Sequence, residues 1–196
     1  QVEGIRGVTA DDIREAHASG CEIKLLAVAQ YRDDSHARGV SVRVHPSLVP
    51  ADNPLASVHG AFNAVLIEAE AAGRLMFYGS DVVAAAAHRV HGGQAPRESS
   101  YADLPVLGPE SAITRYQVQL RVDDQPGSLA ALAGVFAGNG VSIDSVRQSA
   151  YVGGHDAIVT IVTHPASVFH LDAAVDGLRR EDRVLEVVSV QRVEGQ

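Results

Sequence analysis

The segment Asp124-Gln125-Pro126-Gly127 has residue types that could bind an amino acid. It lies between an apolar strand-like stretch and an apolar helix-like stretch, so Gly127 would let another molecule approach the backbone where a helix begins. The free amide groups and positive dipole end of that helix favour an α-carboxylate, and the Asp124 carboxylate could accept from an α-ammonium group. The pattern therefore indicates a site for a zwitterionic amino acid. An ordinary tight loop with Asp124 as a helix cap explains the same residues, and both interpretations stay open at this point.

The other residue types that could do chemistry are isolated in the sequence. None of the nine histidines forms an HxxxH or HExxH pair, and His88 and His91 have no third ligand placed by sequence, so no metal site is expected. Cys21 follows the expected end of a helix, whose negative dipole end raises a thiol pKa, and this favours a packed thiol over a nucleophile. Lys24 is the only lysine and so the only candidate for Schiff-base chemistry, but a solvated or salt-bridged lysine explains it more simply.

Phosphate-binding glycine motifs are absent from the sequence. There is no GxGxxG after a strand-like stretch and no GxxxxGK[ST]. The residues of this chain therefore predict no cofactor site.

The first 93 residues read as alternating helix and strand. Strand 21–32 is apolar on both faces, which predicts cover on both sides. In the next strand, Val40, Val42 and Val44 alternate with polar residues, which predicts burial on one face. The other expected elements are a helix over 10–19 with a capping box at Thr9–Asp12, a helical turn over 54–58, a hairpin over 63–69 and 75–78 with its bend at Gly73, and an Ala-rich helix over 81–90.

A Pro- and Gly-rich linker over 94–110 separates this part from a second domain over 111–196. The second domain has the order β-α-β-β-α-β, which predicts a ferredoxin-like fold. Its two helices should cover one face of the sheet and leave the other for a partner. The fold class is therefore α+β, a mixed-sheet α/β segment over 1–93 followed by a βαββαβ domain.

Composition excludes several classes of protein. A hydrophobic fraction of 46% over 196 residues is too high for a disordered chain, and a net charge of −8 argues against nucleic acid and anionic membranes as partners. No apolar run approaches the ~20 residues of a membrane span. A single cysteine fits a reducing cytoplasm.

Two sets of residues resemble known families. The stretch TRYQVQLRVDDQPGSLAALAGVFAGNGVSIDSVRQ resembles the ACT domain, an amino-acid-sensing module, through Asp124, Pro126-Gly127 and Gly140-Val141-Ser142-Ile143. Three earlier segments resemble homoserine dehydrogenase in the order of that family: GIRGVTADDIREAHASGCEIKLLAVAQ, VSVRVHPSLVPADNPLASVHGAFNAVLIEAEAAGRLMFYG and ESSYADLPVL. The whole chain therefore resembles a C-terminal portion of homoserine dehydrogenase.

This resemblance implies an NADPH- or NADH-dependent enzyme that interconverts aspartate semialdehyde and homoserine, on the path to threonine, isoleucine and methionine. The family's Rossmann domain and its catalytic Asp and Lys belong upstream of residue 1. No catalytic or cofactor-binding residue is therefore assigned to this chain, which is expected to be inactive by itself and to bind no cofactor. A Gly-rich loop that the family usually has after Phe77-Tyr78-Gly79 is missing, because Ser80-Asp81 runs straight into the next helix.

The resemblance also implies a homo-oligomer, a dimer or larger, and an effector, with L-threonine as the first candidate. The expected effector-binding residues, which would meet between two copies of the chain, are Asp124, Gln125, Gly127, Val141, Ser142 and Ile143. A stand-alone ACT-type regulatory protein that binds an amino acid is the alternative.

Overall fold

The computed structural model describes residues 4–34, 37–71, 73–80, 103–108, 111–150 and 155–195. The predicted linker and the predicted helix over 81–90 lie mainly or wholly outside these residues. The N-terminal part, residues 4–80, contains η1 (Ile5–Gly7), α1 (Ala10–Ala18), β1 (Cys21–Asp33), β2 (Arg38–Pro50), η2 (Pro54–Ser57), β3 (Asn63–Ala69) and β4 (Gly73–Gly79). The βαββαβ unit, residues 113–193, contains β6 (Ile113–Asp123), α3 (Ser128–Gly138), β7 (Ile143–Ala150), β8 (Asp156–Thr163), β9 (Ala166–Ser167), α4 (Val168–Leu178) and β10 (Val184–Val193), and β5 (Val106–Leu107) precedes it.

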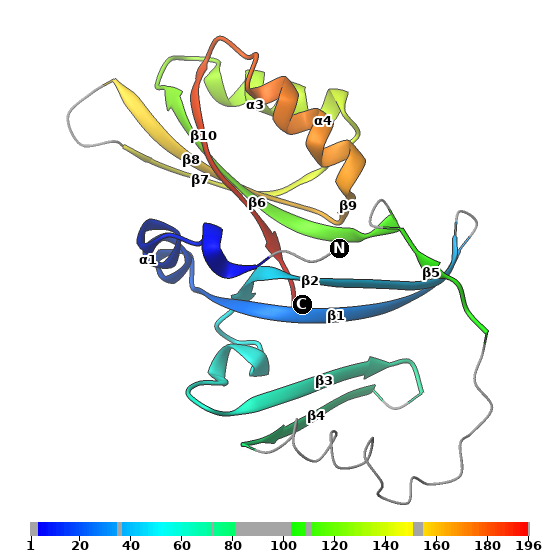
Figure 1. Ribbon diagram of the computed structural model, residues 1–196. Helices are drawn as coiled ribbons and strands as arrows, with labels where there is room; N and C mark the ends of the chain where they lie inside the picture. The colour runs from blue at the N-terminus through cyan, green and yellow to red at the C-terminus, as the bar shows by residue number, and fades with distance from the viewer. Residues whose placement is uncertain are drawn as a thin grey trace, which may run out of the picture.

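The βαββαβ unit has the ferredoxin-like topology that the sequence predicts. Its strands are ordered β10-β6-β8-β7, and each neighbouring pair is antiparallel. Helices α3 and α4 pack on one face of these strands (Figure 1). The apolar side chains of β6 alternate with polar ones, so that Val118, Leu120 and Val122 are buried beneath the two helices together with Leu132 and Phe136 of α3.

One sheet runs through both parts of the chain. Beyond β6, strand β10 pairs in parallel with β2, at Arg192 opposite Ser47 and Val193 opposite Leu48, and β2 pairs antiparallel with β1 along its whole length. The order of the sheet is therefore β1-β2-β10-β6-β8-β7. Figure 1 shows β10 descending from the βαββαβ unit to the end of β2. The sequence pattern does not predict this connection.

Strand β2 is buried on one face, as predicted, but the buried face is the polar one. Arg43 is 4% exposed and His45 is fully buried, whereas Val42 is 47% exposed. The segment that follows β10 lies against this polar face, where Glu194 is the partner of Arg43. Alternation in the sequence gives the period of a strand but does not say which face has a charged partner elsewhere in the chain.

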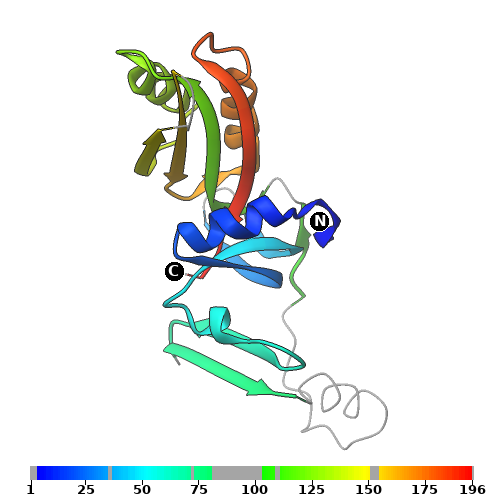
Figure 2. The same ribbon diagram turned by 90° about the vertical axis from the view of Figure 1, so that its left-hand side faces the viewer.

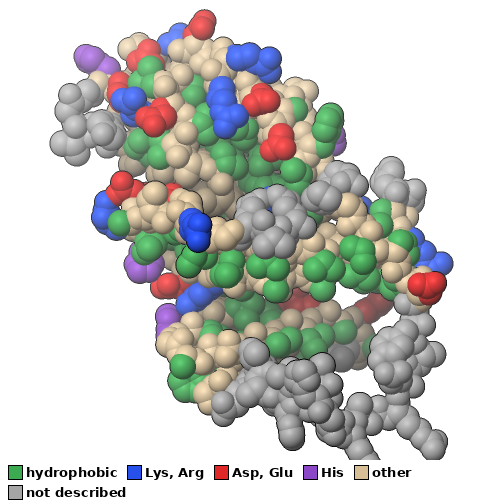
Figure 3. Space-filling model, viewed as in Figure 1, with side chains coloured by type: hydrophobic (Ala, Val, Ile, Leu, Met, Phe, Trp, Pro, Cys, Tyr) green, Lys and Arg blue, Asp and Glu red, His purple; other side chains and the backbone are tan. Residues whose placement is uncertain are grey.

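The face of β1 and β2 that carries the alternating apolar side chains is open in one chain. Leu25 is 52% exposed and Tyr31 is 54% exposed, and the register places Ala29 of β1 opposite Val42 of β2 on this face. Figure 3 shows hydrophobic side chains in a row along β1, on the side toward the β3–β4 hairpin. The prediction that β1 is covered on both sides is therefore wrong for a single chain.

The β3–β4 hairpin and helix α1 form as predicted. The hairpin pairs Val65 with Phe77 and Ile67 with Leu75, and it forms a separate two-stranded sheet. Helix α1 begins with a reciprocal capping box at Thr9, the motif that the Thr-x-x-Asp spacing predicts. In Figures 1 and 2, α1 lies between β1–β2 and the strands of the βαββαβ unit, on the face opposite α3 and α4. The face expected to be left for a partner is thus partly occupied by a helix of the same chain.

Candidate functional site

The loop between β6 and α3 has the geometry expected of an anion-binding turn. Gly127 is the N-cap of α3 and adopts a left-handed conformation with φ of 92°, which a residue with a Cβ rarely adopts. The turn is closed because the Ser128 amide donates to the Gln125 carbonyl over 3.1 Å and the Ser128 hydroxyl donates to the Asp123 carbonyl over 2.7 Å. No side chain caps the helix, so its first turn presents backbone amides to the outside.

Asp124 does not act as a helix cap. Its carboxylate instead accepts a hydrogen bond of 2.8 Å from the Nε2 of Gln148, on strand β7. Residues 122 and 124–130 and Gln148 line a surface pocket of about 470 Å³ at this place. The pocket therefore combines a carboxylate with an uncapped helix start, the two groups that a zwitterion needs. Gln148 was not among the predicted site residues; it could be found only by working out the register of β7 against its neighbours.

The two halves of the predicted effector site lie at opposite ends of the sheet in one chain. Strands β6 and β7 both pair antiparallel with β8, so they run in the same direction. Asp124 follows the end of β6, whereas Ile143 begins β7 opposite Thr163, at the other end of β8. Val141 is buried at 3% exposure and Ser142 is exposed. A site that uses both halves therefore needs a second copy of the chain.

Polar contacts hold α1 against the open face of the sheet, the face that α3 and α4 do not cover. The Arg147 guanidinium of β7 donates to the Ala18 carbonyl over 2.8 Å, to the Ser19 hydroxyl over 2.8 Å and to the Glu15 carboxylate over 2.9 Å. On the other side of the helix, Gln191 of β10 donates to Asp12 over 3.0 Å. The main buried residue of α1 is Ala16, which packs on Leu48 and Val193.

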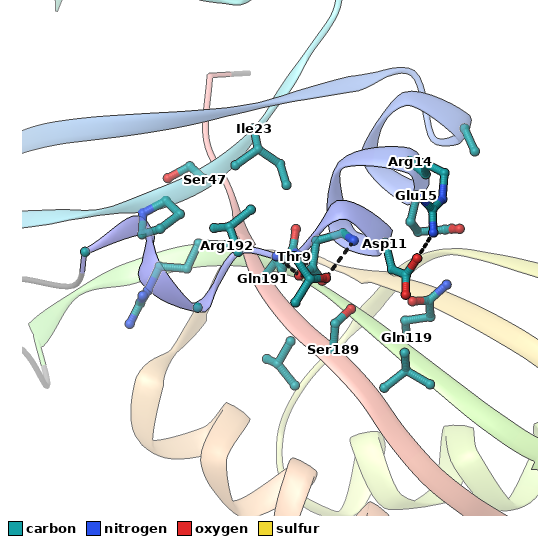
Figure 4. A pocket seen from close by; sticks show the side chains of 18 residues that line it. Thr9, Asp11, Arg14, Glu15, Ile23, Ser47, Gln119, Ser189, Gln191 and Arg192 are labelled. Atoms are coloured by element: carbon teal, nitrogen blue, oxygen red, sulfur yellow. Dashed lines mark hydrogen bonds and ion pairs between the residues drawn. The ribbon is translucent and has the colours of Figure 1, made fainter.

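A cleft of about 890 Å³ opens between α1 and β10 (Figure 4). Thr9, Asp11, Arg14 and Glu15 line it from α1, and Gln119, Ser189, Gln191 and Arg192 line it from the sheet. Because its walls come from both parts of the chain, its shape depends on how α1 sits on the sheet.

A buried polar layer joins β2 to the segment that follows β10. Arg43 donates through Nε and Nη2 to one carboxylate oxygen of Glu194, at 3.2 and 2.8 Å. His45 is fully buried beside them, with Nδ1 2.8 Å from the Ser47 hydroxyl and Nε2 3.7 Å from Glu194. Burial, together with the charge of Arg192, lowers the pKa of His45.

The isolated candidates of the sequence take structural roles. Burial raises the pKa of the Cys21 thiol, with Asp52 adding to it, so the expected direction is confirmed although burial rather than a helix end is the main cause. Lys24 Nζ donates to the Val58 carbonyl over 2.8 Å and lies 3.5 Å from His59 Nδ1 rather than beside a carboxylate. Within the described ranges, no group of three or more His, Cys, Asp or Glu residues could hold a metal ion. His88 and His91 lie outside those ranges.

Two parts of the chain match known protein families. Residues 1–88 match the homoserine dehydrogenase family, and residues 116–180 match the ACT domain. The first part of the chain is therefore similar to a homoserine dehydrogenase domain segment, and the second part is similar to an ACT domain. Homoserine dehydrogenases of Mycobacterium tuberculosis and Corynebacterium glutamicum are 48% and 42% identical to it over 98% of the chain. The crystal structure of a homoserine dehydrogenase from Thiobacillus denitrificans matches with a TM-score of 0.76 and 31% identity, over 98% of this chain and 47% of that one.

The chain spans about half the length of the curated relatives it matches, 48% for M. tuberculosis and 46% for C. glutamicum. The M. tuberculosis alignment extends over 211 positions, more than the 196 residues of the chain, so the relative has residues that this chain lacks. A loop after Gly79 would be a difference of this kind, and it stays a prediction.

The family implies a nicotinamide cofactor. None of the strand-to-helix connections among the described residues has a GxGxxG sequence, and the Gly127 turn is followed by Ser-Leu-Ala rather than a dinucleotide fingerprint. The described residues therefore do not fit a dinucleotide, and no step of hydride transfer is assigned to them. No helix within the described parts of the chain is long and apolar enough to cross a membrane.

The buried His45 predicts a loss of stability in acid. Its folded-state pKa lies below the unfolded value, so the unfolded chain takes up the proton first as the pH falls below about 6.5. The free energy of unfolding should therefore decrease with falling pH below that value, with His45 contributing a slope of up to about 1.4 kcal/mol per pH unit. Urea unfolding of the wild type and His45→Gln over this range measures the difference.

The matched control is His155→Gln, which removes a histidine from an exposed position rather than from the buried layer beside Glu194. A His45→Gln variant with the same pH dependence as the wild type would contradict the prediction.

Proposed function

We propose that this chain is the substrate-domain and regulatory portion of an NAD(P)-dependent homoserine dehydrogenase, which interconverts aspartate semialdehyde and homoserine. The observation that carries the proposal is the match of 98% of the chain, at 48% identity, to homoserine dehydrogenase across both of its parts. The continuous sheet supports it, because the ACT domain is built onto the dehydrogenase segment through β10 and β2 rather than tethered by a linker alone.

In this proposal the nicotinamide and the catalytic Asp and Lys belong to a preceding segment of the enzyme. NADPH or NADH supplies the hydride when it is bound there. The role of the present residues is to support the substrate-binding face, to pair subunits and to report the level of an amino acid. The 196-residue chain by itself should then be unable to reduce or oxidise the substrate.

Nicotinamide absorbance in the presence of homoserine tests this expectation. We expect no turnover above background by the pure 196-residue chain, and restored turnover when it is produced as part of an enzyme with the nucleotide-binding domain. Turnover by the 196-residue chain, after a full-length contaminant has been excluded by mass spectrometry, would overturn the assignment of roles.

The ACT domain is proposed to bind L-threonine at the Asp124–Gly127 turn. The uncapped start of α3 receives the carboxylate, and Asp124 accepts from the ammonium group in place of Gln148. Gln125 and Gly127 shape the turn. Val141, Ser142 and Ile143 of a second copy would complete the site, with Ser142 facing the side-chain hydroxyl of the ligand.

Asp124→Ala should weaken threonine binding because it removes the acceptor for the ammonium group. A hydrogen bond to a charged group contributes about 1.5–3 kcal/mol. Its loss should therefore raise the Kd for threonine roughly 10- to 150-fold. Calorimetry with threonine, serine, isoleucine and methionine measures affinity and selectivity. Asp176→Ala, on the exposed side of α4, is the control and should bind as the wild type does. Equal affinity of the Asp124 and Asp176 variants would refute this site.

We also propose that the chain assembles at least as a dimer through the apolar face of β1 and β2. That face exposes Leu25, Tyr31 and Val42 by about half of their surface each, on two long paired strands. The β3–β4 hairpin exposes Val65 and Phe77 as well. An apolar face of this extent is uncommon on a monomer, and a second copy is the occupant that symmetric assembly offers.

Val42→Lys should convert the dimer to a monomer because it places a charge in the centre of the proposed interface. Sedimentation at micromolar concentration distinguishes the species. Ile13→Lys, an exposed residue of α1, is the matched control and should leave the dimer intact. A wild-type chain that sediments only at the mass of a monomer would contradict the proposal, as would an intact Val42→Lys dimer.

A further inference from the structure

Two adjacent side chains of β7 contact different parts of the chain. One reaches the effector turn, Asp124–Gly127, and the other reaches the dehydrogenase segment, residues 4–80. Successive side chains of a strand point to opposite faces. Gln148 pairs in register with Val159, which is buried under the helices, and Arg147 pairs with Thr160, which faces α1. Gln148 therefore reaches the turn at Asp124 from one side of the strand, while Arg147 reaches α1 from the other.

Arg147 joins β7 to the N-terminal part of the chain, residues 4–80, through several hydrogen bonds. One guanidinium donates to Glu15, to Ser19 and to the carbonyl of Ala18 at the C-terminal end of α1. A cation at this end of a helix is also favoured by the helix dipole. The Thr160 hydroxyl adds a long contact of 3.5 Å to the same Glu15 carboxylate.

The rest of the interface gives α1 little resistance to movement. Its buried side chain is the small Ala16, and near its start Asp12 accepts a hydrogen bond from Gln191 of β10. Interfaces of this polar kind within a chain commonly allow relative motion of the parts they join. Arg147 is therefore a direct contact through which a change in the position of β7 would reach α1.

We propose that β7 is the regulatory link of this protein, and that an α-amino acid bound at the effector turn acts on the dehydrogenase segment through Gln148 and Arg147. The inference rests on the proposed amino-acid site. The ammonium group of the ligand competes with Gln148 for the Asp124 carboxylate. Release of Gln148 frees the end of β7, the Arg147 contact loosens, and α1 moves with the wall of the cleft that it shares with β10. The ligand shifts the equilibrium because it binds the state in which Asp124 is free.

Hydrogen–deuterium exchange of the 196-residue chain, with and without saturating L-threonine, tests the link at the amides of α1. In the wild type, threonine should increase exchange over residues 10–18 and leave α4 unchanged. In Arg147→Gln, exchange of α1 should be high without ligand and should not rise further with it. Arg121→Gln removes an arginine of the same sheet that pairs with Asp156 and Glu186, so it should behave as the wild type does.

Calorimetry on the same samples separates the two proposals. Because coupling is reciprocal, Arg147→Gln should bind threonine more tightly, by roughly the 5- to 150-fold of ordinary allosteric coupling, and Arg121→Gln should not. Threonine binding to the wild type with unchanged exchange of α1 would overturn the link and leave the amino-acid site standing. No binding of any amino acid would overturn the site, and the link with it.

Discussion

The pairing of β10 with β2 is the constraint on which the rest of the architecture depends. Only two residue pairs, Arg192–Ser47 and Val193–Leu48, form this parallel ladder. They turn a four-stranded ACT sheet and a two-stranded antiparallel ribbon into one sheet, and they place Glu194 against Arg43. Arg43 is 4% exposed, and removing one partner of a buried ion pair commonly costs about 3–5 kcal/mol because the other charge is left uncompensated. The ladder is short, but its register determines which residues meet, including Arg43 and Glu194.

This junction also bears on the burial of the β1–β2 ribbon, whose polar face is buried while much of its apolar face is exposed. The polar side of β2 is buried within its own chain, and Glu194, just after β10, supplies the charge that pairs with Arg43. The apolar side, with Val42 and its neighbours on β1, is left outward. Most of this apolar side is exposed, and its end at Leu48 and Ile23 packs under Ala16 of α1. The ACT sheet divides its faces in a similar way, with helices on the apolar side and α1 on the polar side.

Local pattern predicts most elements of this fold, and long-range pairing accounts for what it misses. The capping box at Thr9, the β3–β4 hairpin and the βαββαβ order all follow from residues close together in sequence, although Gly73, the predicted bend, is already paired with Ala69 in β4. The burial of His45 does not, because its cover comes from the far end of the chain. In the candidate site, Asp124 and Gly127 are identified by the turn they build. Gln148 escapes detection because glutamine on a strand carries no signal until the strand's register is known.

The ion pair between Arg43 and Glu194 joins residues 151 positions apart, and this separation bears on how the chain is made. During synthesis, β1 and β2 leave the ribosome long before β10 exists. Until then Arg43 and His45 have no cover, and the polar side of the ribbon stays hydrated while its apolar side is already complete. A nascent chain at that stage exposes a paired apolar ribbon without the domain that later holds it in place. Between the emergence of β2 and that of β10, Arg43 therefore lacks the carboxylate that it has in the folded protein.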